Sequence, residues 1–456
     1  MLEKTTGMRY VRLSTSISIL EIIVWVRYWV LGLCDPMGES RLTRFVSDSD
    51  SVRRQNRGLV LNALRIHGPL SRTVLASQTG LSHASMTAIT QDLLAQEIVA
   101  ELADEQKSDA KARGRPAVRI SFNRSAAYVV LFEIEVSRAR LSLVDYGGTL
   151  VDRIDLPLAP TLFSSVPPAD FLHERIEYLR ERNPTESKRL RRIAISVQGI
   201  LDRDGRSLKW SPIAHLAGIP FADSLSEAFD LPVTLYKRGR LLAEGARWLN
   251  PDLHDASVAT VFVGSTVAMG MTFPGEILGR GTEGTTEFGH MNHTPNGALC
   301  RCGMRGCIEA YASDYGVLRT AYSVPETTTP AASVPPQQYD DLIQRAEAGD
   351  RSATHAFNLA GRAIGFGLSR MMAVFDPAHI LIVGPGARAF DLMRAEIMSA
   401  LAGALVCRVN GLPSVVAYRD EKEPIFRGLM MKALNDIDQV EFAALQNVAR
   451  MAADAG

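Results

Sequence analysis

The sequence has few cysteines, no net charge and no uninterrupted apolar run long enough to span a membrane. Each of these absences excludes a class of protein. Five cysteines in 456 residues, without a secretory leader pattern, exclude a disulfide-stapled scaffold. They indicate a reducing compartment, where clustered thiols more often bind metal. Lys and Arg number 50 and Asp and Glu 50, so the whole chain is not a polycation. With 46% apolar residues the chain is long enough for two or three domains.

The longest apolar stretch, ISILEIIVWVRYWVLGLC at residues 17–34, is interrupted by Glu21 and Arg27. A charge at mid-bilayer costs about 2.5–3.5 kcal/mol, and no cleavage site with small residues follows. Met37 is an alternative start of translation. A mis-assigned start, a poorly packed amphipathic tail and a membrane anchor all remain open. We predict that residues 1–50 are an extension, mis-assigned or disordered, and expect no membrane partner.

Residues 56–99 carry three helical patterns in close succession. The first stops at Gly68-Pro69, the second opens with Ser71 as N-cap and ends at Gly80, and the third opens with Ser82 as N-cap. The segments IVAEL and AVRISF follow as strands on either side of DEQKSDAKARGRP, which predicts a two-stranded wing. A plain three-helix bundle is the alternative. The order helix, turn, helix and hairpin favours a winged helix-turn-helix domain that binds DNA.

The charge of this segment is a weaker indication of nucleic acid. From Ser51 to Arg124 there are eleven Lys/Arg against six Asp/Glu. We assign the domain to residues 51–123. Its third helix is expected to present its first residues to base edges in the major groove, and Met86 is expected in the core. The predicted DNA-binding residues are Arg72, Ser82, His83, Ser85, Thr87, Arg113 and Arg115, of which the arginines are better placed for phosphates or the minor groove.

After Asn123 the periodicity changes to strands followed by helices, in two successive blocks. This pattern predicts an α/β protein with two lobes over residues 124–440, followed by a tail at residues 441–456. The Pro/Thr/Ser-rich segment 323–336 predicts a mobile surface loop. The expected strands lie in AYVVLFEIEV, ARLSLVDYGGTLVDRIDLPL, RRIAISVQGIL, LPVTLYK, VATVFVGS and HILIVG, with a hairpin turn at Gly147-Gly148, and the expected helices are Phe171–Asn183, Leu241–Leu249 and Ala353–Phe375.

Three of the five cysteines fall in CRCGMRGCIE, residues 300–309, and a fourth thiol is missing from the cluster. The segment EFGHMNH upstream offers the fourth ligand: His290, ten residues before Cys300, gives with Cys300, Cys302 and Cys307 the closed tetrahedral shell of structural zinc. Such a shell leaves no position for a catalytic water. His293 is the rival fourth ligand, and unliganded thiols are the remaining alternative.

The motif GH, nine residues, C-x-C-G-x-x-G-C-x-E-A-Y-A-S resembles that of the ROK family (repressors, open reading frames and kinases). The resemblance runs from about Arg53 to Asp436 and includes FDPAHILIVGPG. It implies two ribonuclease-H-like lobes of the actin and sugar-kinase type behind a winged helix, with a zinc loop at residues 287–309. It also implies structural Zn²⁺ on His290, Cys300, Cys302 and Cys307, and sugar contacts from Glu287, His290 and Glu309.

The catalytic elements of ROK kinases are missing. Where the first phosphate loop of the family has D-x-G-G-T, this chain has Glu133 to Ser137, with Glu135 in place of a glycine. The second loop, GSTVAMG from Gly264 to Gly270, keeps only its end glycines. The catalytic Asp is absent, and Lys237 and Arg238 occupy its region. Phosphoryl transfer is therefore not expected, and the chain is predicted not to be an enzyme.

These features together predict a cytoplasmic transcriptional regulator of sugar-related genes, most simply a repressor. It would bind operator DNA as a homodimer or homotetramer and respond to a sugar or sugar-phosphate effector. An active sugar kinase with an appended DNA-binding module is the first alternative. A regulator controlled only by a protein partner is the second.

Overall fold

The computed structural model describes residues 49–102, 118–253, 255–274, 276–278, 286–419 and 423–442. Residues 53 onward belong to one compact unit, Arg53–Gly456. The predictions for residues 1–48, for most of the tail and for the wing tip with Arg113 and Arg115 lie outside the described residues. Among the described residues, no helix combines the length and the apolarity needed to cross a membrane.

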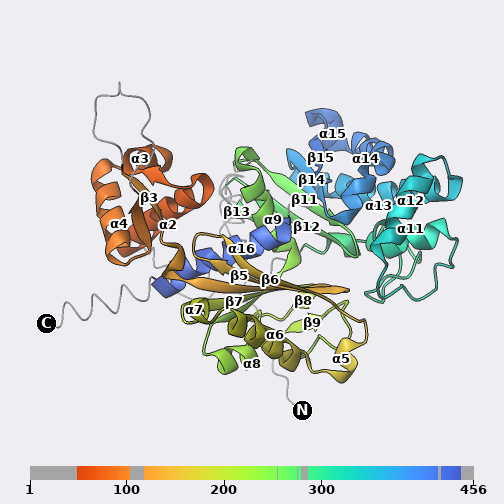
Figure 1. Ribbon diagram of the computed structural model, residues 1–456. Helices are drawn as coiled ribbons and strands as arrows, with labels where there is room; N and C mark the ends of the chain where they lie inside the picture. Colours follow the sequence, from red (N-terminus) through yellow and green to blue (C-terminus); the bar gives the residue numbers. More distant parts are fainter. Residues whose placement is uncertain are drawn as a thin grey trace, which may run out of the picture. The chain divides into compact units, whose positions relative to one another are not determined.

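The N-terminal elements follow the predicted order of helix, turn, helix and hairpin (Figure 1). Ser71 Oγ accepts a hydrogen bond from the Val74 N–H at 3.3 Å, and Ser82 Oγ accepts one from the Ser85 N–H at 3.1 Å. Both predicted N-caps are thereby confirmed. The elements are α2 (Ser49–His67), β1 (Leu70–Ser71), α3 (Arg72–Thr79), α4 (His83–Ala95), β2 (Val99–Leu102) and β3 (Arg119–Phe122). Strand β3 pairs antiparallel with both β1 and β2.

The first lobe is built on a five-stranded sheet in the order β10-β7-β4-β5-β6. Strands β4, β5 and β6 form an antiparallel meander, and β7 and β10 extend it in parallel. The predicted turn at Gly147-Gly148 joins β5 to β6 and is confirmed, with Gly148 at φ +85°. The elements are η1 (Arg124–Ala126), β4 (Tyr128–Ile134), β5 (Arg138–Asp145), β6 (Leu150–Pro157), α5 (Leu162–Ser165), α6 (Pro168–Arg182), α7 (Pro184–Ser187), β7 (Leu190–Val197), β8 (Ile200–Leu201), β9 (Leu208–Trp210), α8 (Phe221–Phe229) and β10 (Val233–Lys237).

The second lobe repeats this topology with the sheet order β13-β12-β11-β14-β15. In each lobe the first three strands form an antiparallel meander, and two further strands lie parallel to the first. This repetition is the two-lobed α/β architecture that the sequence predicts. The elements are α9 (Arg238–Leu249), η2 (Pro251–Leu253), β11 (Val258–Val263), β12 (Val267–Phe273), β13 (Glu276–Ile277), η3 (Phe288–His290), α10 (Glu309–Ala312), α11 (Asp314–Ala321), α12 (Pro336–Glu347), α13 (Arg351–Phe375), β14 (His379–Val383), η4 (Pro385–Ala389), α14 (Phe390–Gly403), α15 (Leu405–Asn410), β15 (Ser414–Ala417), α16 (Pro424–Asp436) and η5 (Ile437–Glu441).

Each predicted helix is present but begins two or three residues earlier than its apolar pattern. Helix α6 starts at Pro168, since proline suits the first helical turn. Helix α13 starts after Asp350, whose carboxylate accepts from the N–H groups of Ser352 and Ala353. The segment 323–336 is exposed, as predicted, and Arg301 donates from two nitrogens to the Ala331 carbonyl within it.

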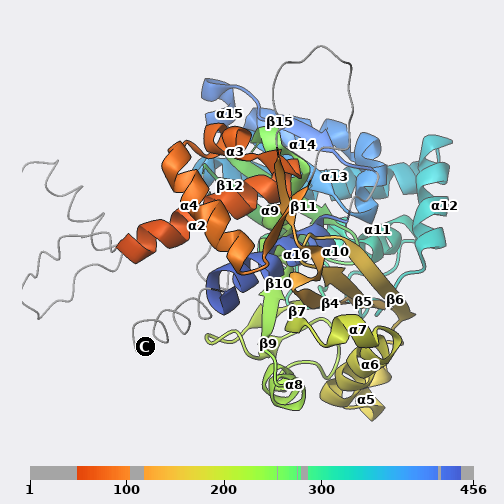
Figure 2. The same ribbon diagram turned by 60° about the vertical axis from the view of Figure 1, so that its left-hand side comes forward.

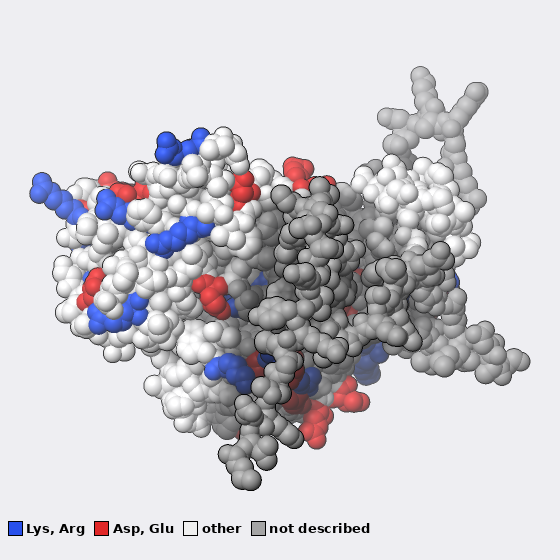
Figure 3. Space-filling view, turned by 180° about the vertical axis from the view of Figure 1, so that it is seen from behind, with Lys and Arg blue, Asp and Glu red and all other residues white. Residues whose placement is uncertain are grey.

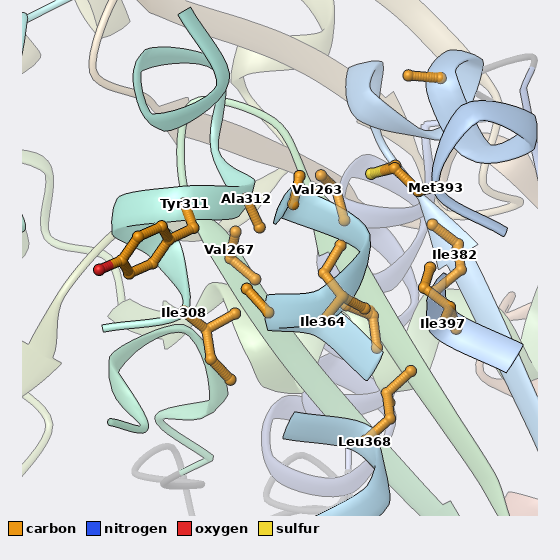
Figure 4. Packing of buried hydrophobic residues seen from close by; sticks show 14 of the residues in the cluster. Val263, Val267, Ile308, Tyr311, Ala312, Ile364, Leu368, Ile382, Met393 and Ile397 are labelled. Carbon is orange, nitrogen blue, oxygen red and sulfur yellow. The ribbon is translucent and has the colours of Figure 1, made fainter. Parts of the chain in front are cut away.

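Three large apolar cores and one small cluster of Ala246, Val258 and Leu381 hold the described elements together. One fills the first lobe. A second packs α13 onto the sheet of the second lobe, where Ile364 and Leu368 lie near Ile308 (Figure 4). The third joins the apolar faces of α2, α3 and α4 to β4, β5 and α16. The N-terminal helices therefore share a core with the first lobe and the C-terminal helix.

Helices α9 and α16 cross closely between the lobes (Figures 1 and 2). A Cβ on Gly428 of α16 would lie 2.0 Å from the Leu241 carbonyl oxygen of α9, so only glycine permits this approach. On the described surface seen in Figure 3, basic and acidic side chains lie interspersed in small groups. That distribution fits a chain with zero net charge.

Candidate functional site

The structure brings together the four predicted zinc ligands. His290 ends η3, Cys300 and Cys302 lie in the following turn, and Cys307 lies just before α10. One ligand atom from each residue lies within 4.8 Å of the other three. Cys302 Sγ and Cys307 Sγ are 3.7 Å apart, as are Cys300 Sγ and His290 Nδ1. Zinc–sulfur bonds of about 2.3 Å in a tetrahedron place sulfurs about 3.8 Å apart, so the cluster fits a zinc ion.

The backbone of this loop is built for close turns. Gly303 and Gly306 both have positive φ, at +85° and +80°. A Cβ on Gly306 would meet the Thr294 carbonyl oxygen at 1.7 Å, so the loop requires glycine there. Hydrogen bonds from Cys300 and Cys307 lower the pKa of the Cys302 thiol. This favours the thiolate, which is the form that binds metal.

His293, the rival fourth ligand, does not lie in the cluster. Its ring packs against Tyr311 at 5.2 Å and Phe366 at 6.0 Å between centroids. Burial lowers the pKa of His293. The geometry therefore selects His290 over His293.

Glu309, a predicted sugar contact, is turned toward the cluster. It is 1% exposed, and its Oε2 accepts from the Val267 N–H at 3.2 Å. Its Oε1 lies 3.6 Å from Cys300 Sγ and accepts from Tyr315 Oη at 3.4 Å. Burial, and then Cys300, raise the pKa of Glu309 to about 7. These contacts make Glu309 a support for the cysteine loop.

A small cavity lies beside the cluster, where β10 meets α9. Its volume is about 50 Å³, and its wall includes Trp210, Lys237, Thr266, Glu287 and His290. The Trp210 ring meets the His290 ring edge to face, with centroids 5.4 Å apart. A closed cavity of about 150 Å³ holds a ring the size of benzene, so the space of about 50 Å³ does not enclose a whole sugar ring.

The cations predicted in place of the catalytic Asp do line this cavity, and each has an acidic partner. Lys237, with a side chain 8% exposed, forms an ion pair with Glu287. Arg238 lies 4.1 Å above the Phe262 ring and 3.4 Å from Glu135. Burial tends to raise the pKa of Glu135, but Arg238 and other arginines outweigh burial and lower it. Glu135, which follows β4, is thus paired with Arg238, the first residue of α9.

Three residues of this region were not singled out from the sequence. Gln198 directly follows β7, Trp210 ends β9, and both line the cavity together with Thr266. Gln198 Oε1 accepts from the Val136 N–H at 3.1 Å. The predicted strand RRIAISVQGIL contains Gln198, but no local pattern in a sequence indicates which side chains line a cavity together.

The second candidate site is the start of α4. Ser82, His83 and Thr87 are exposed, Ser85 is half-buried, and Met86 is fully buried as expected. The Ser82 and Thr87 hydroxyls bond within the helix start, to Ser85 Oγ and to the His83 carbonyl.

The arginines predicted for this site divide into described and undescribed residues. Arg72 donates to Thr90 Oγ1 at 3.0 Å and to Glu101 at 2.7 Å, so it braces α3 against α4 and β2. Arg113 and Arg115 lie outside the described residues. Arg72 is therefore engaged through Nε and Nη2 within the domain, and its side chain is 30% exposed.

Comparison with known proteins places this arrangement in a family. The family profile described as "ROK family" matches residues 140–424. The chain belongs to the ROK family. The xylose repressor of Bacillus subtilis is 26% identical over 376 residues, which cover 81% of this chain and 93% of that protein. The DNA-binding transcriptional repressor Mlc of Escherichia coli is 28% identical over 356 residues, covering 77% and 86% respectively.

Among solved structures, the chain is similar to a ROK family transcriptional regulator described as a homolog of the Escherichia coli Mlc protein. The TM-score is 0.68 at 21% identity, over 87% of this chain and 99% of that structure. This likeness confirms the fold predicted from the sequence, including the presence of elements in front of the ROK lobes.

Proposed function

We propose that the protein is a DNA-binding transcriptional repressor of sugar-related genes whose ROK lobes have lost phosphoryl transfer. The observation that carries the proposal is the helix, turn, helix and hairpin arrangement in front of two kinase-type lobes. The named repressors match the chain over 86% or more of their own length. Strands β2 and β3, with the connection at residues 103–117 between them, would form the wing of a winged helix.

The loss of catalysis is supported by the ion pairs in the cleft. A kinase needs a carboxylate to accept the hydroxyl proton and backbone N–H groups to hold phosphates. Lys237 and Arg238 cannot accept that proton, and Glu135 adds a negative charge where a polyanion would bind. No transfer of phosphate from ATP to a hexose is expected. Turnover that copurifies with the protein and is lost in Lys237→Met would overturn this part of the proposal.

Zinc is proposed as the structural metal of His290, Cys300, Cys302 and Cys307. It would hold η3 and α10 in place without taking part in chemistry. Protein purified without chelator is expected to contain one zinc per chain, and Cys302→Ser is expected to lose it. Cys407→Ala is the matched control, since Cys407 is buried outside the cluster. A zinc-free native protein would contradict the assignment.

The protein is proposed to act in the cytoplasm. It is proposed to form a homodimer or homotetramer, because paired recognition helices would read two half-sites about one helical turn apart. A sugar or sugar-phosphate effector would bind in the cleft. The alternative in which only a protein partner controls the repressor has no observation of its own among the described residues.

DNA binding is tested by genomic footprinting, followed by salt-dependent binding to the recovered operator. Thr87→Ala is expected to change which sequences bind, by about 1–3 kcal/mol for each lost base contact. Arg115→Ala is expected to weaken all sequences and to reduce the salt slope by about one. Thr185→Ala, at an exposed position of α7, is the control. Operator binding unaffected by both recognition variants would place DNA recognition elsewhere.

A further inference from the structure

A cavity of about 530 Å³ lies between helix α2 and η5, outside the cleft. Among the described residues, most of its wall comes from α2, and Asp438 and Gln439 come from η5. Its wall shares no described residue with the cavity beside the cysteine cluster. Sites for small organic molecules have volumes of about 300–1,000 Å³, so this space is large enough to hold such a ligand.

The wall of this cavity contains a buried arginine with incomplete hydrogen bonding. Arg57 lines the cavity, is 7% exposed, and donates from Nη1 to Gln96 Oε1 at 3.0 Å. Its Nε and Nη2 have no hydrogen-bond partner among the described residues. Burial lowers the pKa of Arg57 more than the nearby Tyr146 and Asp438 raise it. A guanidinium group has five donors and no acceptor, so a ligand that completes this bonding must supply acceptor atoms.

The acid in the wall is already bonded elsewhere. Asp438 accepts two hydrogen bonds from Arg65 and one from the Tyr146 hydroxyl. Arg54, three residues before Arg57 on the same helix, adds a second guanidinium group to the wall. The wall therefore has an excess of positive charge. Carboxylate and phosphate oxygens make the strongest hydrogen bonds to guanidinium groups, because the bonds are charge-assisted and often bidentate.

Gly58 opens the α2 side of the cavity and is an independent observation. It lies in the interior of α2, where glycine is less stable than alanine. A Cβ added at Gly58 would meet nothing within 4 Å beyond its own helix, so packing does not require glycine there. Glycine does allow a bound molecule to approach the helix backbone closely. The residue thus suits a ligand rather than the packing of α2.

The rest of the wall combines apolar and amide groups. Leu59 is a large apolar side chain that is 41% exposed. Asn62 and Gln439 carry amides that both donate and accept hydrogen bonds. A ligand with an apolar body would remove the Leu59 side chain from water.

We propose that this cavity is a second ligand site, separate from the cleft, for a small organic anion that joins a carboxylate or phosphate group to an apolar body. The anionic group would accept hydrogen bonds from Arg57 and Arg54, and the apolar body would lie along Gly58 and Leu59. The proposal goes beyond the proposed function, since neither the sugar cleft nor operator DNA takes part in it. Carboxylate and phosphate share the chemistry that two guanidinium groups recognise.

The test is calorimetric titration of the full-length protein, without DNA or sugar, with three ligands that share one aromatic ring: benzoate, phenyl phosphate and benzyl alcohol. At least one of the two anions is expected to bind at least about tenfold more tightly than the neutral alcohol, because charge-assisted hydrogen bonds are gained. Preference for benzoate or for phenyl phosphate distinguishes a carboxylate site from a phosphate site. No binding of either anion, or an affinity no greater than that for the alcohol, would overturn the proposal.

Two pairs of variants locate the bound anion. Arg57→Gln is expected to weaken binding of the preferred anion by about tenfold or more. Arg53→Gln is its matched control, since Arg53 lies on the same helix but pairs with Asp92 at the surface. Gly58→Trp is expected to fill the space and to weaken binding by about tenfold or more, whereas Gly58→Ala retains binding.

Thermal unfolding of each variant separates loss of binding from loss of folding. Arg57→Gln removes a buried charge with few partners, and is expected to unfold at the same temperature as wild type or higher. Unchanged anion affinity in folded Arg57→Gln would place the anion elsewhere and reject the proposal. If Arg57→Gln does not fold, unchanged anion affinity in Gly58→Trp is sufficient to reject it.

Discussion

The Arg65–Asp438 pair and the Lys237–Glu287 pair differ in how many partners each charged group has. Where α2 meets η5, Arg65 donates to both carboxylate oxygens of Asp438, at 2.9 and 2.7 Å, and to the Tyr146 carbonyl at 3.0 Å. The Tyr146 hydroxyl donates to the same Asp438. In the cleft, Lys237 is paired with Glu287 alone among the contacts of the described residues.

Exposure separates the two pairs further. The Arg65 and Asp438 side chains are 2% and 6% exposed, whereas that of Glu287 is 38% exposed. A pair buried on both sides leaves an uncompensated charge when one partner is removed, but a solvated partner returns to water. The Arg65–Asp438 pair therefore fixes helix α2 to the C-terminal segment η5. In the second, the half-exposed acid can leave the pair and stay hydrated.

The largest loss of stability is expected when the Arg65–Asp438 ion pair is removed. Asp438→Asn removes the negative charge that compensates the buried Arg65, and should lower the free energy of unfolding by about 3–5 kcal/mol. Urea unfolding of the full-length protein measures this. Asp92→Asn is the matched control, because its pair with Arg53 is exposed on both sides, at 37% and 49%. The control should shift by less than about 1 kcal/mol. Equal shifts would remove the distinction between buried and exposed pairs.

An intermediate change in stability is expected when Glu133 is replaced, because its carboxylate is buried and has only a distant basic partner. It is 5% exposed, its Oε2 has no hydrogen-bond partner among the described residues, and Arg140 lies 3.9 Å away. Burial, and then the charge of Glu135, raise the pKa of Glu133 to about 7. The folded state therefore binds more protons than the unfolded state between about pH 4.5 and 7, so this group destabilises the protein as pH rises through that window.

Glu133→Gln imitates the protonated form. It should stabilise the protein at pH 8 by on the order of 2–3 kcal/mol and change little below pH 4.5. Urea unfolding midpoints at several pH values measure the difference. Glu227→Gln, at an exposed position of α8, should give parallel curves. A Glu133→Gln variant that is less stable at pH 8 would contradict the raised pKa.

The smallest effect is expected in the cleft. Lys237→Met should change the free energy of unfolding by less than about 1 kcal/mol, since methionine fills the buried site and the exposed Glu287 stays hydrated. The same urea measurement applies. A loss as large as that of Asp438→Asn would show that the Lys237 pair contributes as much to stability as the buried Arg65–Asp438 pair.

Much of the site followed from residues close together in the chain. The caps of α3 and α4 were predictable because a serine oxygen bonds an N–H three residues ahead. The cysteine loop was predictable because Cys300, Cys302 and Cys307 are too close in sequence to separate in space. The sequence also favoured His290 over His293, and the structure adds the reason, since the His293 ring is packed against Tyr311 and Phe366.

The sequence by itself determined the order of elements, the two-lobed α/β class, the capped starts of α3 and α4 and the cluster of three cysteines, because each rests on local periodicity, capping or spacing. Only the tertiary structure decided which charges meet. Arg65 and Asp438 are 373 residues apart, and Lys237 and Glu287 are 50 apart. An ion pair leaves no periodic pattern in a sequence, and its strength depends on burial that two separate elements create when they pack.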